Sequence, residues 1–395
     1  MGMARRAAAA VVAAMALVAT ASCDSGDPGT GSAAPSSTTS STAGHGGHPS
    51  SESLQSSAPL RDGERFRSAG MPLPYTPAAP AGATDEYRCF LVDPELRAPA
   101  FLTGSRFQPG NEDLVHHAIF FRVEPAGVAA AERADAEAPG EGWTCFGDAG
   151  IGDDTAWVAH WAPGTGEMLM APGIGYPMSA GSRLVMQVHY NVLGTPGRPG
   201  ADRSSVRLRL SDRGNLRPLQ TETLPVPVEL PCPRDESGPL CEREAAVRDV
   251  ADRFGDQARS AVDQLNRSCN RGEAPVPGSE QSCDRPVPGA GTVYAAAGHM
   301  HLLGRSIRVE LNPGTARART LLDVPAYDFD EQAVSPLPAP VTVRPDDVVR
   351  VTCTHDASLR RKLPALRSPP PRYVVWGEGT SDEMCLGLLI WSPTA

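Results

Sequence analysis

The sequence predicts an all-β fold built from antiparallel sandwiches. Its apolar runs are short and are separated by Pro, Gly and Asp, the spacing that is typical of sandwich strands. Gly and Pro number 39 each and aromatic residues make up only 5%, which disfavours a bundle of long helices. The expected strands are Glu86–Val92, Ala100–Phe107, Leu114–Val123, Arg183–Val192, Val206–Leu210, Val293–His301, Ile307–Leu311, Val348–Thr354, Tyr373–Trp376 and Met384–Trp391.

The first 22 residues have the features of an export signal. Arg5 and Arg6 precede the apolar run Ala7–Ser22. This run is short for a membrane span, which needs about 20 apolar residues, but it suits the apolar region of a signal peptide. We therefore expect residues 1–22 to be removed during export.

Two processing sites compete at the end of this signal. Ala19-Thr20-Ala21 fits a small-residue cleavage site, and cleavage at Ala21 would release a secreted protein. Thr20-Ala21-Ser22-Cys23 resembles a bacterial lipobox with Thr where Leu is usual. We favour the lipobox, because Cys23 begins a tether and is the odd cysteine of nine. The sequence thus predicts a lipoprotein anchored to the cell membrane through Cys23.

The segment after Cys23 is predicted to be a flexible tether that extends over residues 23–80. Residues 24–58 are mainly Ser, Thr, Gly, Pro and Ala, and such a segment cannot bury enough apolar surface to offset the entropy of ordering. The folded part is expected to begin near Asp85.

The acidic net charge argues against nucleic acid and anionic membrane surfaces as partners. The chain has 36 basic and 46 acidic residues, a formal charge of −10, whereas nucleic acid and anionic membrane surfaces require a basic patch. Only one basic residue is lysine, Lys362, a bias that indicates a GC-rich bacterium.

Outside the cytosol, the eight other cysteines are expected to form four disulfides. Four of them flank the amphipathic stretch Glu242–Ser268, so residues 231–286 read as a disulfide-pinned helical insertion. Gly255-Asp256 should break this stretch. Of three connectivities we favour Cys241–Cys269 with Cys232–Cys283, which would close a helical hairpin.

Five histidines lie within predicted strands, where an unpaired imidazole is costly to bury. His299 and His301 share one strand face at about 6.6 Å along the strand, so both rings can reach one ion. His116 and His117 are adjacent and point to opposite faces unless the strand bends there. Together with His189 they indicate metal binding. His160 and His355 are expected to be structural.

Four motifs, in this order, resemble those of the copper type II, ascorbate-dependent monooxygenases, which include peptidylglycine α-hydroxylating monooxygenase and dopamine β-monooxygenase. The motifs are Val115–Phe121 (VHHAIFF), Leu184–Tyr190 (LVMQVHY), His299–Gly304 (HMHLLG) and Gly379–Cys385 (GTSDEMC).

The resemblance implies two jelly-roll-like β-sandwich lobes, residues 81–212 and 213–395, that face each other across a cleft and carry one copper each. It assigns His116, His117 and His189 to the first copper, which stores an electron. It assigns His299, His301 and Met384 to the second copper, which binds O₂ and hydroxylates a substrate C–H bond. Imidazole with thioether suits Cu(I) and not zinc or magnesium.

The resemblance also places Gln187 and Tyr87 near the electron-storing copper and pairs Cys89 with Cys145 and Cys353 with Cys385. It implies a small-molecule substrate, O₂ and an electron donor, either ascorbate or another one-electron donor. One departure concerns the substrate. The carboxylate anchors of the peptide-hydroxylating member are replaced by Ala297, Leu386 and Leu388. An apolar set cannot pair a carboxylate, so we expect a neutral or apolar substrate.

Three other functions share some of these sequence features. A non-catalytic copper-binding lipoprotein would keep the six ligands without O₂ chemistry. A cupredoxin-like electron carrier would need a free Cys thiolate beside His and Met, against which the even cysteine count argues. A histidine-brace polysaccharide monooxygenase needs an N-terminal His after processing, whereas this chain would begin at Ser22 or Cys23.

Overall fold

The computed structural model describes residues 57–80, 83–152, 155–192, 200–367 and 369–394. The export signal, Cys23 and most of the expected tether lie outside these residues. The described part is mostly β, and all ten expected strands are present within a few residues of their predicted ends. No helix within the described ranges is both long and apolar enough to cross a bilayer.

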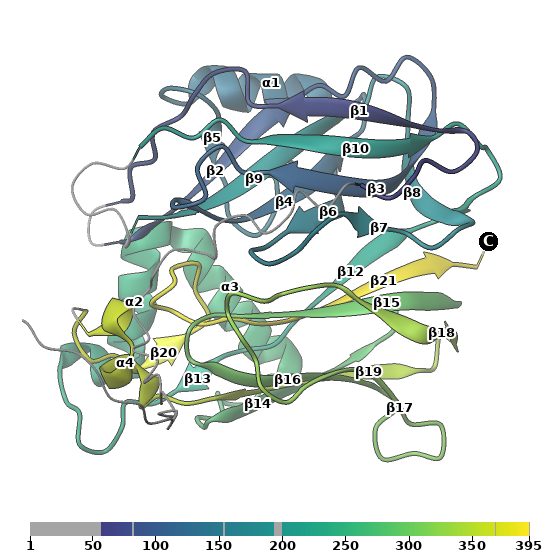
Figure 1. Ribbon diagram of the computed structural model, residues 1–395. Coiled ribbons are helices and arrows are strands. Elements are labelled where there is room, and N and C mark those ends of the chain that lie inside the picture. Colours follow the sequence, from purple (N-terminus) through teal and green to yellow (C-terminus); the bar gives the residue numbers. More distant parts are fainter. Residues whose placement is uncertain (1–56, 81–82, 153–154, 193–199, 368, 395) are drawn as a thin grey trace, which may run out of the picture. The chain divides into compact units, whose positions relative to one another are not determined.

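The N-terminal half is a pair of sheets that pack face to face (Figure 1). Phe90, Leu102, Met186 and Leu208, which come from four strands, lie almost fully buried in its core. One sheet has the order β1 (Glu64–Gly70), β10 (Ser205–Ser211), β3 (Ala100–Gln108), β8 (Ile174–Met178) and β11 (Arg217–Pro218), with β7 (Met168–Leu169) also paired to β3. The other has the order β5 (Trp143–Thr144), β2 (Asp85–Val92), β9 (Arg183–Asn191), β4 (Val115–Val123) and β6 (Thr155–Trp161).

The outer face of the second sheet carries its own apolar cluster. Helix α1 (Val128–Glu137) packs there through Ala131, beside Val185 and the disulfide Cys89–Cys145. This disulfide is the one that the resemblance implied.

The C-terminal half contains two further four-stranded sheets around a second core, in which Met300, Val309, Val351 and Leu389 are buried. One sheet has the order β12 (Gln220–Pro225), β21 (Cys385–Pro393), β15 (Gly291–Met300) and β18 (Ser335–Val343). The other has the order β14 (Glu280–Pro286), β19 (Val348–His355), β16 (Gly304–Leu311) and β17 (Arg319–Val324). The short strands β13 (Glu229–Leu230) and β20 (Val374–Val375) pair with each other, and helix α4 (Leu359–Lys362) follows β19.

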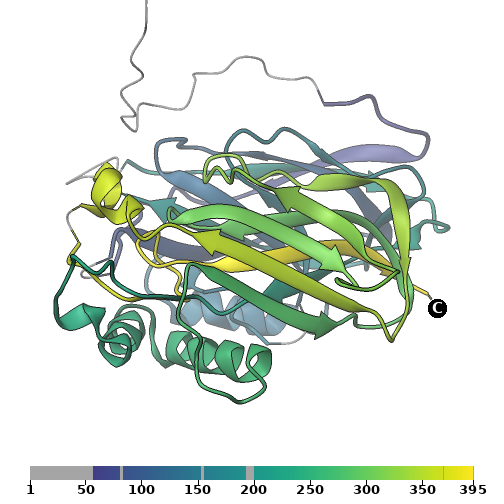
Figure 2. The ribbon, with the colours of Figure 1, turned by 90° about the horizontal axis from the view of Figure 1, so that it is seen from below.

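The helical insertion is broken where expected but is bridged differently. Helices α2 (Arg243–Phe254) and α3 (Asp256–Cys269) are separated by Gly255, whose φ of +86° favours glycine (Figure 2). The disulfides are Cys232–Cys241 and Cys269–Cys283, so the predicted pairing is wrong. Residues 280–286 are not part of a separate insertion, because β14 joins the sheet of β19 and thereby brings Cys283 to the end of α3.

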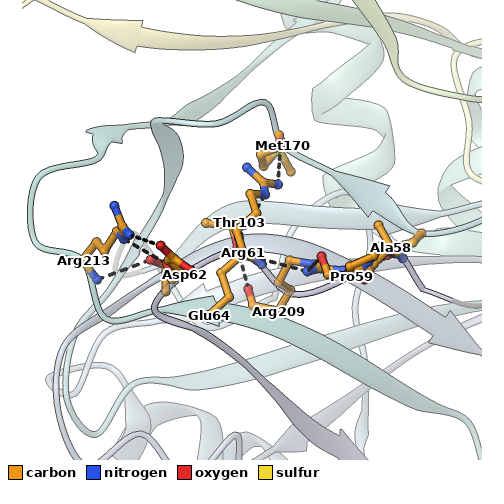
Figure 3. Close-up of polar contacts among 11 residues, drawn as sticks. Ala58, Pro59, Arg61, Asp62, Glu64, Thr103, Met170, Arg209 and Arg213 are labelled. Atoms are coloured by element: carbon orange, nitrogen blue, oxygen red, sulfur yellow. Dashed lines mark hydrogen bonds and ion pairs between the residues drawn. The ribbon is translucent and has the colours of Figure 1, made fainter.

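The predicted extent of the tether is also wrong at its C-terminal end, since β1 lies inside residues 23–80 and pairs with β10. The fully buried guanidinium of Arg209 donates to the carbonyl oxygens of Ala58 and Pro59 and pairs with Glu64 (Figure 3). Thr103 donates to the same Glu64 carboxylate at 2.8 Å. Buried ion pairs and hydrogen bonds therefore fix β1 and the residues directly before it. This segment has few apolar residues, so its sequence pattern does not indicate that it is folded.

Candidate functional site

Three of the predicted ligands form a compact cluster. His116 and His117 lie on β4, and His189 lies opposite His117 on β9. A register shift between Val115 and His117 bends β4 at this point, which lets two adjacent histidines serve one site. One ring nitrogen of each histidine lies within 4.8 Å of the others, and the Nδ1 atom of His117 is 3.1 Å from that of His116 and 3.4 Å from that of His189.

Aromatic rings and a carboxylate hold this cluster in place. Tyr87 stacks on His189 with ring centroids 4.2 Å apart, and His116 stacks on Phe329 of the C-terminal half at 4.1 Å. The Nε2 atom of His189 lies 3.0 Å from Oδ1 of Asp85, which leaves Nδ1 for the cluster. A carboxylate behind a histidine is the usual support of a metal-ligating imidazole.

Asp85 was not recognised in the sequence as a site residue. It is 1% exposed, and its carboxylate also accepts bonds from Thr84 and from the backbone N–H and the hydroxyl of Thr380. Burial alone would raise the pKa of Asp85, but the bonds from His189 and Thr380 hold it below its ordinary value. In the sequence, only its position two residues before Tyr87 indicates that Asp85 belongs to the site.

The second predicted set lies at the end of β15 and the start of β21. His301 is fully buried, and neither of its ring nitrogens has a hydrogen-bond partner among the described residues. Its ring centroid is 5.2 Å from that of His299, whose Nδ1 lies 2.5 Å from Oε1 of Gln332. Burial lowers the pKa of His301 well below its ordinary value and that of His299 to about 4, so both imidazoles are neutral, as metal binding requires.

Glu383 links His301 to Met384, the residue that follows Glu383 in the chain. Its carboxylate accepts bonds from the backbone N–H groups of His301, Leu303 and Met384, the last two at 2.8 and 3.0 Å. Despite these bonds, burial raises the pKa of Glu383 to about 8. The disulfide Cys353–Cys385 fixes the adjacent residue, as the resemblance implied. Glu383 thus holds Met384 and the His301 segment together.

The two sets lie next to each other. The ring centroids of His117 and His299 are 5.5 Å apart, and the Tyr87 hydroxyl donates to the Glu378 carbonyl at 2.9 Å. The expected open cleft between the halves is therefore not confirmed. Instead, residues of both halves line a partly open cavity of about 180 Å³. Its lining includes His117, His299, Met384, Gln187, Tyr87 and the three substituted anchor positions Ala297, Leu386 and Leu388.

Further polar residues line this cavity. Gln187 is 1% exposed and donates through Nε2 to the carbonyl of Asp148 at 2.9 Å, while its Oε1 has no partner among the described residues. His160, which the sequence led us to expect as structural, also lies in the lining, and burial lowers its pKa to about 4. Glu378 was missed altogether. Burial, with Asp382 and Asp148 nearby, raises its pKa to about 8.

The comparison with protein families bears on the C-terminal half. Residues 278–394 match the family model described as copper type II ascorbate-dependent monooxygenase, C-terminal domain. The predicted family is confirmed. The matched range contains His299, His301 and Met384, and the family is copper-dependent with ascorbate as reductant. This match supports, at the family level, a copper-dependent monooxygenase, an oxidoreductase family whose partners are a substrate, O₂ and an electron donor.

Solved structures give only weak similarities. An allantoicase structure is 11% identical, covers 84% of this chain and 90% of its own, and has a TM-score of 0.19. A xanthan lyase from Paenibacillus is 11% identical, with 82% and 25% covered and a TM-score of 0.19. A putative secreted protein from Parabacteroides distasonis is 7% identical, with 85% and 92% covered and a TM-score of 0.20. TM-scores this low carry no argument about fold or function.

The donor set of this site fits copper. Three imidazoles converge at one position. At the other, the buried imidazole of His301 has no partner among the described residues, and His301 and Met384 both donate from their backbone N–H groups to Glu383. A thioether ligand suits Cu(I), copper readily accepts imidazole ligands, and magnesium prefers oxygen ligands. The four disulfides also indicate an extracytoplasmic protein, where such copper enzymes can retain their bridges.

Proposed function

We propose that this protein is an exported monooxygenase that hydroxylates a C–H bond of a small substrate, using O₂ and an external electron donor. The observation that carries the proposal is that members of both predicted ligand sets line one cavity. His117 of the first set and His299 and Met384 of the second lie there, and the ring centroids of His117 and His299 are 5.5 Å apart. The donor is ascorbate or another one-electron donor.

Each ligand set has a proposed role. His116, His117 and His189 would hold the electron-storing copper, and His299, His301 and Met384 the copper on the hydroxylating side. When bound, the two ions supply the redox chemistry that activates O₂. Two ions per chain are proposed on this basis.

The protein's own residues position these ligands. Asp85 fixes the ring of His189 through Nε2, and Tyr87 fixes the plane of the same ring by stacking. Glu383 sets the path of the chain at His301 and Met384 through three backbone N–H groups. Gln187 lies in the cavity lining and is held in place by the bond from its Nε2 to the carbonyl of Asp148. Trp157, Trp161 and Trp376 line the cavity and would limit the entry of water.

The cavity supports a substrate without a carboxylate. Ala297, Leu386 and Leu388 all line it and offer no cation or hydrogen-bond donor in their side chains. Burying an unpaired carboxylate there would carry a large desolvation penalty. A glycine-extended peptide is therefore not the proposed substrate.

We further propose that residues 1–22 are a signal peptide and that Cys23 carries the lipid anchor, with secretion if cleavage occurs at Ala21. Both halves would then work at the outer face of the membrane of a GC-rich bacterium. The N-terminal copper lobe would extend to residue 212 and the C-terminal copper lobe over residues 213–395.

Reductant-dependent O₂ uptake by the copper-loaded protein tests this function. We expect ascorbate-dependent uptake that rises when a hydroxylatable substrate is added, with product formed in proportion. Free Cu(II) at equal concentration and the doubly substituted His117→Ala, Met384→Ala protein are the matched controls. Tight copper binding without uptake above these controls would instead support a non-catalytic copper-binding lipoprotein.

A further inference from the structure

One acidic side chain in the cavity has no role in the arrangement described so far. Glu378 is 9% exposed and lines the cavity beside Tyr87 and Met384. Its carboxyl group makes no hydrogen bond and no ion pair with any residue in the described part of the chain. The backbone carbonyl of Glu378 accepts a hydrogen bond from the Tyr87 hydroxyl at 2.9 Å. The backbone of Glu378 is thus fixed while its acid group is left for another partner.

A second acceptor lines the same cavity. Oε1 of Gln187 is buried and has no partner among the described residues, while Nε2 is engaged by the Asp148 carbonyl. An amide oxygen can only accept a hydrogen bond. Buried polar groups in folded proteins nearly always have a partner. Oε1 of Gln187 has almost no accessible surface, so the carboxyl group of Glu378 is the acceptor that a donating ligand in the cavity can reach.

The rest of the lining limits the body of that ligand. Trp157, Trp161 and Ile119 from the N-terminal half and Trp376, Leu386 and Leu388 from the C-terminal half offer mainly apolar surface. The cavity volume of about 180 Å³ is close to that of an engineered cavity of about 150 Å³ that binds benzene. A body of about one six-membered ring therefore fits.

We propose that Glu378 is a specificity-determining residue that binds the hydrogen-bond-donating head group, a hydroxyl or an amine, of a compact apolar substrate. This inference rests on the proposed function, because it names the substrate class of the same cavity. When it is ionised, the acid group pairs with an ammonium group and repels anions. The aromatic and aliphatic walls hold the ring.

Binding of four probes with one common ring tests the proposal. Toluene, benzyl alcohol, benzylamine and benzoate are titrated into the copper-free mature chain at about pH 9, where the carboxyl group of Glu378, whose pKa is raised to about 8, is ionised. Tryptophan fluorescence is the readout, since three tryptophans line the cavity. We expect the alcohol or the amine to bind about tenfold or more tightly than toluene, and benzoate to bind most weakly.

Two substitutions assign this preference to Glu378. Glu378→Leu should remove the preference for the head group and leave toluene binding unchanged. Glu378→Gln keeps an acceptor of similar shape, so it should retain binding of the alcohol but lose at least about tenfold for an ammonium, which distinguishes the two head groups. Glu112→Leu, an exposed substitution outside the cavity, should leave all four affinities unchanged.

The proposal is overturned if Glu378→Leu and Glu378→Gln both retain the full head-group preference, if benzoate binds as tightly as the alcohol and the amine, or if none of the uncharged or cationic probes binds. Because these measurements need neither copper nor O₂, they separate the two claims. Selective binding without O₂ uptake would refute the monooxygenase function, whereas uptake without Glu378-dependent selectivity would refute this inference.

Discussion

The two ligand sets are held in different ways. The three-histidine cluster is fixed by side chains, with Tyr87 stacked on His189 and Asp85 bonded to its Nε2. The His299, His301 and Met384 set is fixed largely through backbone groups, three of which donate to Glu383. His301 keeps both ring nitrogens without a partner in the described residues. The contrast suggests one set with preformed geometry and one whose ligands retain freedom to rearrange.

The sets also meet through one short segment. Thr380 donates from its backbone N–H to Asp85 at 3.0 Å, and Glu383 lies three residues further along the same loop. Asp382 between them pairs with Arg253 of α2 through two bonds of 2.7 Å. The helices therefore support the loop that precedes Met384, and Phe254 and Met384 belong to one apolar cluster. A packing role for the insertion is shown, and a role in turnover stays a hypothesis.

The largest expected effect comes from removing one ligand from each set in separate variants. Met384→Ala should abolish turnover while the three-histidine copper stays bound, because none of its ligands is altered. His117→Ala should remove that copper and stall electron delivery. Metal analysis and single-turnover O₂ uptake measure both outcomes. Full oxygen-dependent activity in Met384→Ala would show that the hydroxylating side is assigned wrongly.

A smaller effect is expected from changing Asp85, which supports the ligand His189 but is not itself a ligand. Asp85→Asn should lower the copper affinity of the three-histidine cluster by about 10- to 100-fold, because an anionic partner of His189 is lost. Competitive chelator titration measures the affinity, and the Cu(II) electron paramagnetic resonance spectrum should change as well. Asp93→Asn, just beyond the same strand and paired with Arg183, is the matched control. An unchanged spectrum and affinity in Asp85→Asn would remove Asp85 from the positioning role.

A third effect concerns the pH dependence of stability. The pKa of Glu378 is raised from 4.5 to about 8 by burial and by Asp382 and Asp148, so the folded state favours the protonated acid. Its contribution to stability is complete below pH 4.5 and is lost as the pH rises through 8. Relative to the parent, Glu378→Gln should gain up to about 4 kcal/mol between pH 5 and 8, since one pKa unit corresponds to about 1.4 kcal/mol. Denaturant unfolding of the copper-free proteins measures this gain. A constant difference across that range would mean that Glu378 is ionised in the folded state.

A further expected effect tests the support behind Met384. Phe254→Ala should cost about 3 kcal/mol of unfolding free energy, because Phe254 is buried and meets Phe146 edge to face at 5.6 Å. The three-histidine copper should bind normally, and any loss of turnover should appear at the Met384 side. Unfolding curves and copper titrations report the two quantities. A change confined to the three-histidine copper would contradict this arrangement.

Much of the fold could be predicted from local patterns, because strands such as β9 and β15 carry long apolar runs. β1 was missed because its fixation depends on Arg209, a residue about 140 positions away in the sequence. The disulfides of the insertion were mispaired because only the pairing of β14 with β19 places Cys283 beside Cys269.

The ligand candidates followed from motifs of a few adjacent residues. Their surroundings did not, since Asp85 and Thr380, or Gln187 and Glu378, meet only through contacts between the two halves. The bend at His116 and His117 depends on a register shift against β9, which no local pattern indicates.

Copper stoichiometry tests the central claim most directly, namely that two ligand sets share one cavity. The mature chain, saturated with Cu(I) under anaerobic conditions and freed of excess metal, should retain two copper ions per chain by elemental analysis. His117→Ala and Met384→Ala should reduce this number from different sites, with the three-histidine signal lost only in His117→Ala. A single tightly bound copper in the parent chain, or zinc retained against copper, would contradict the account.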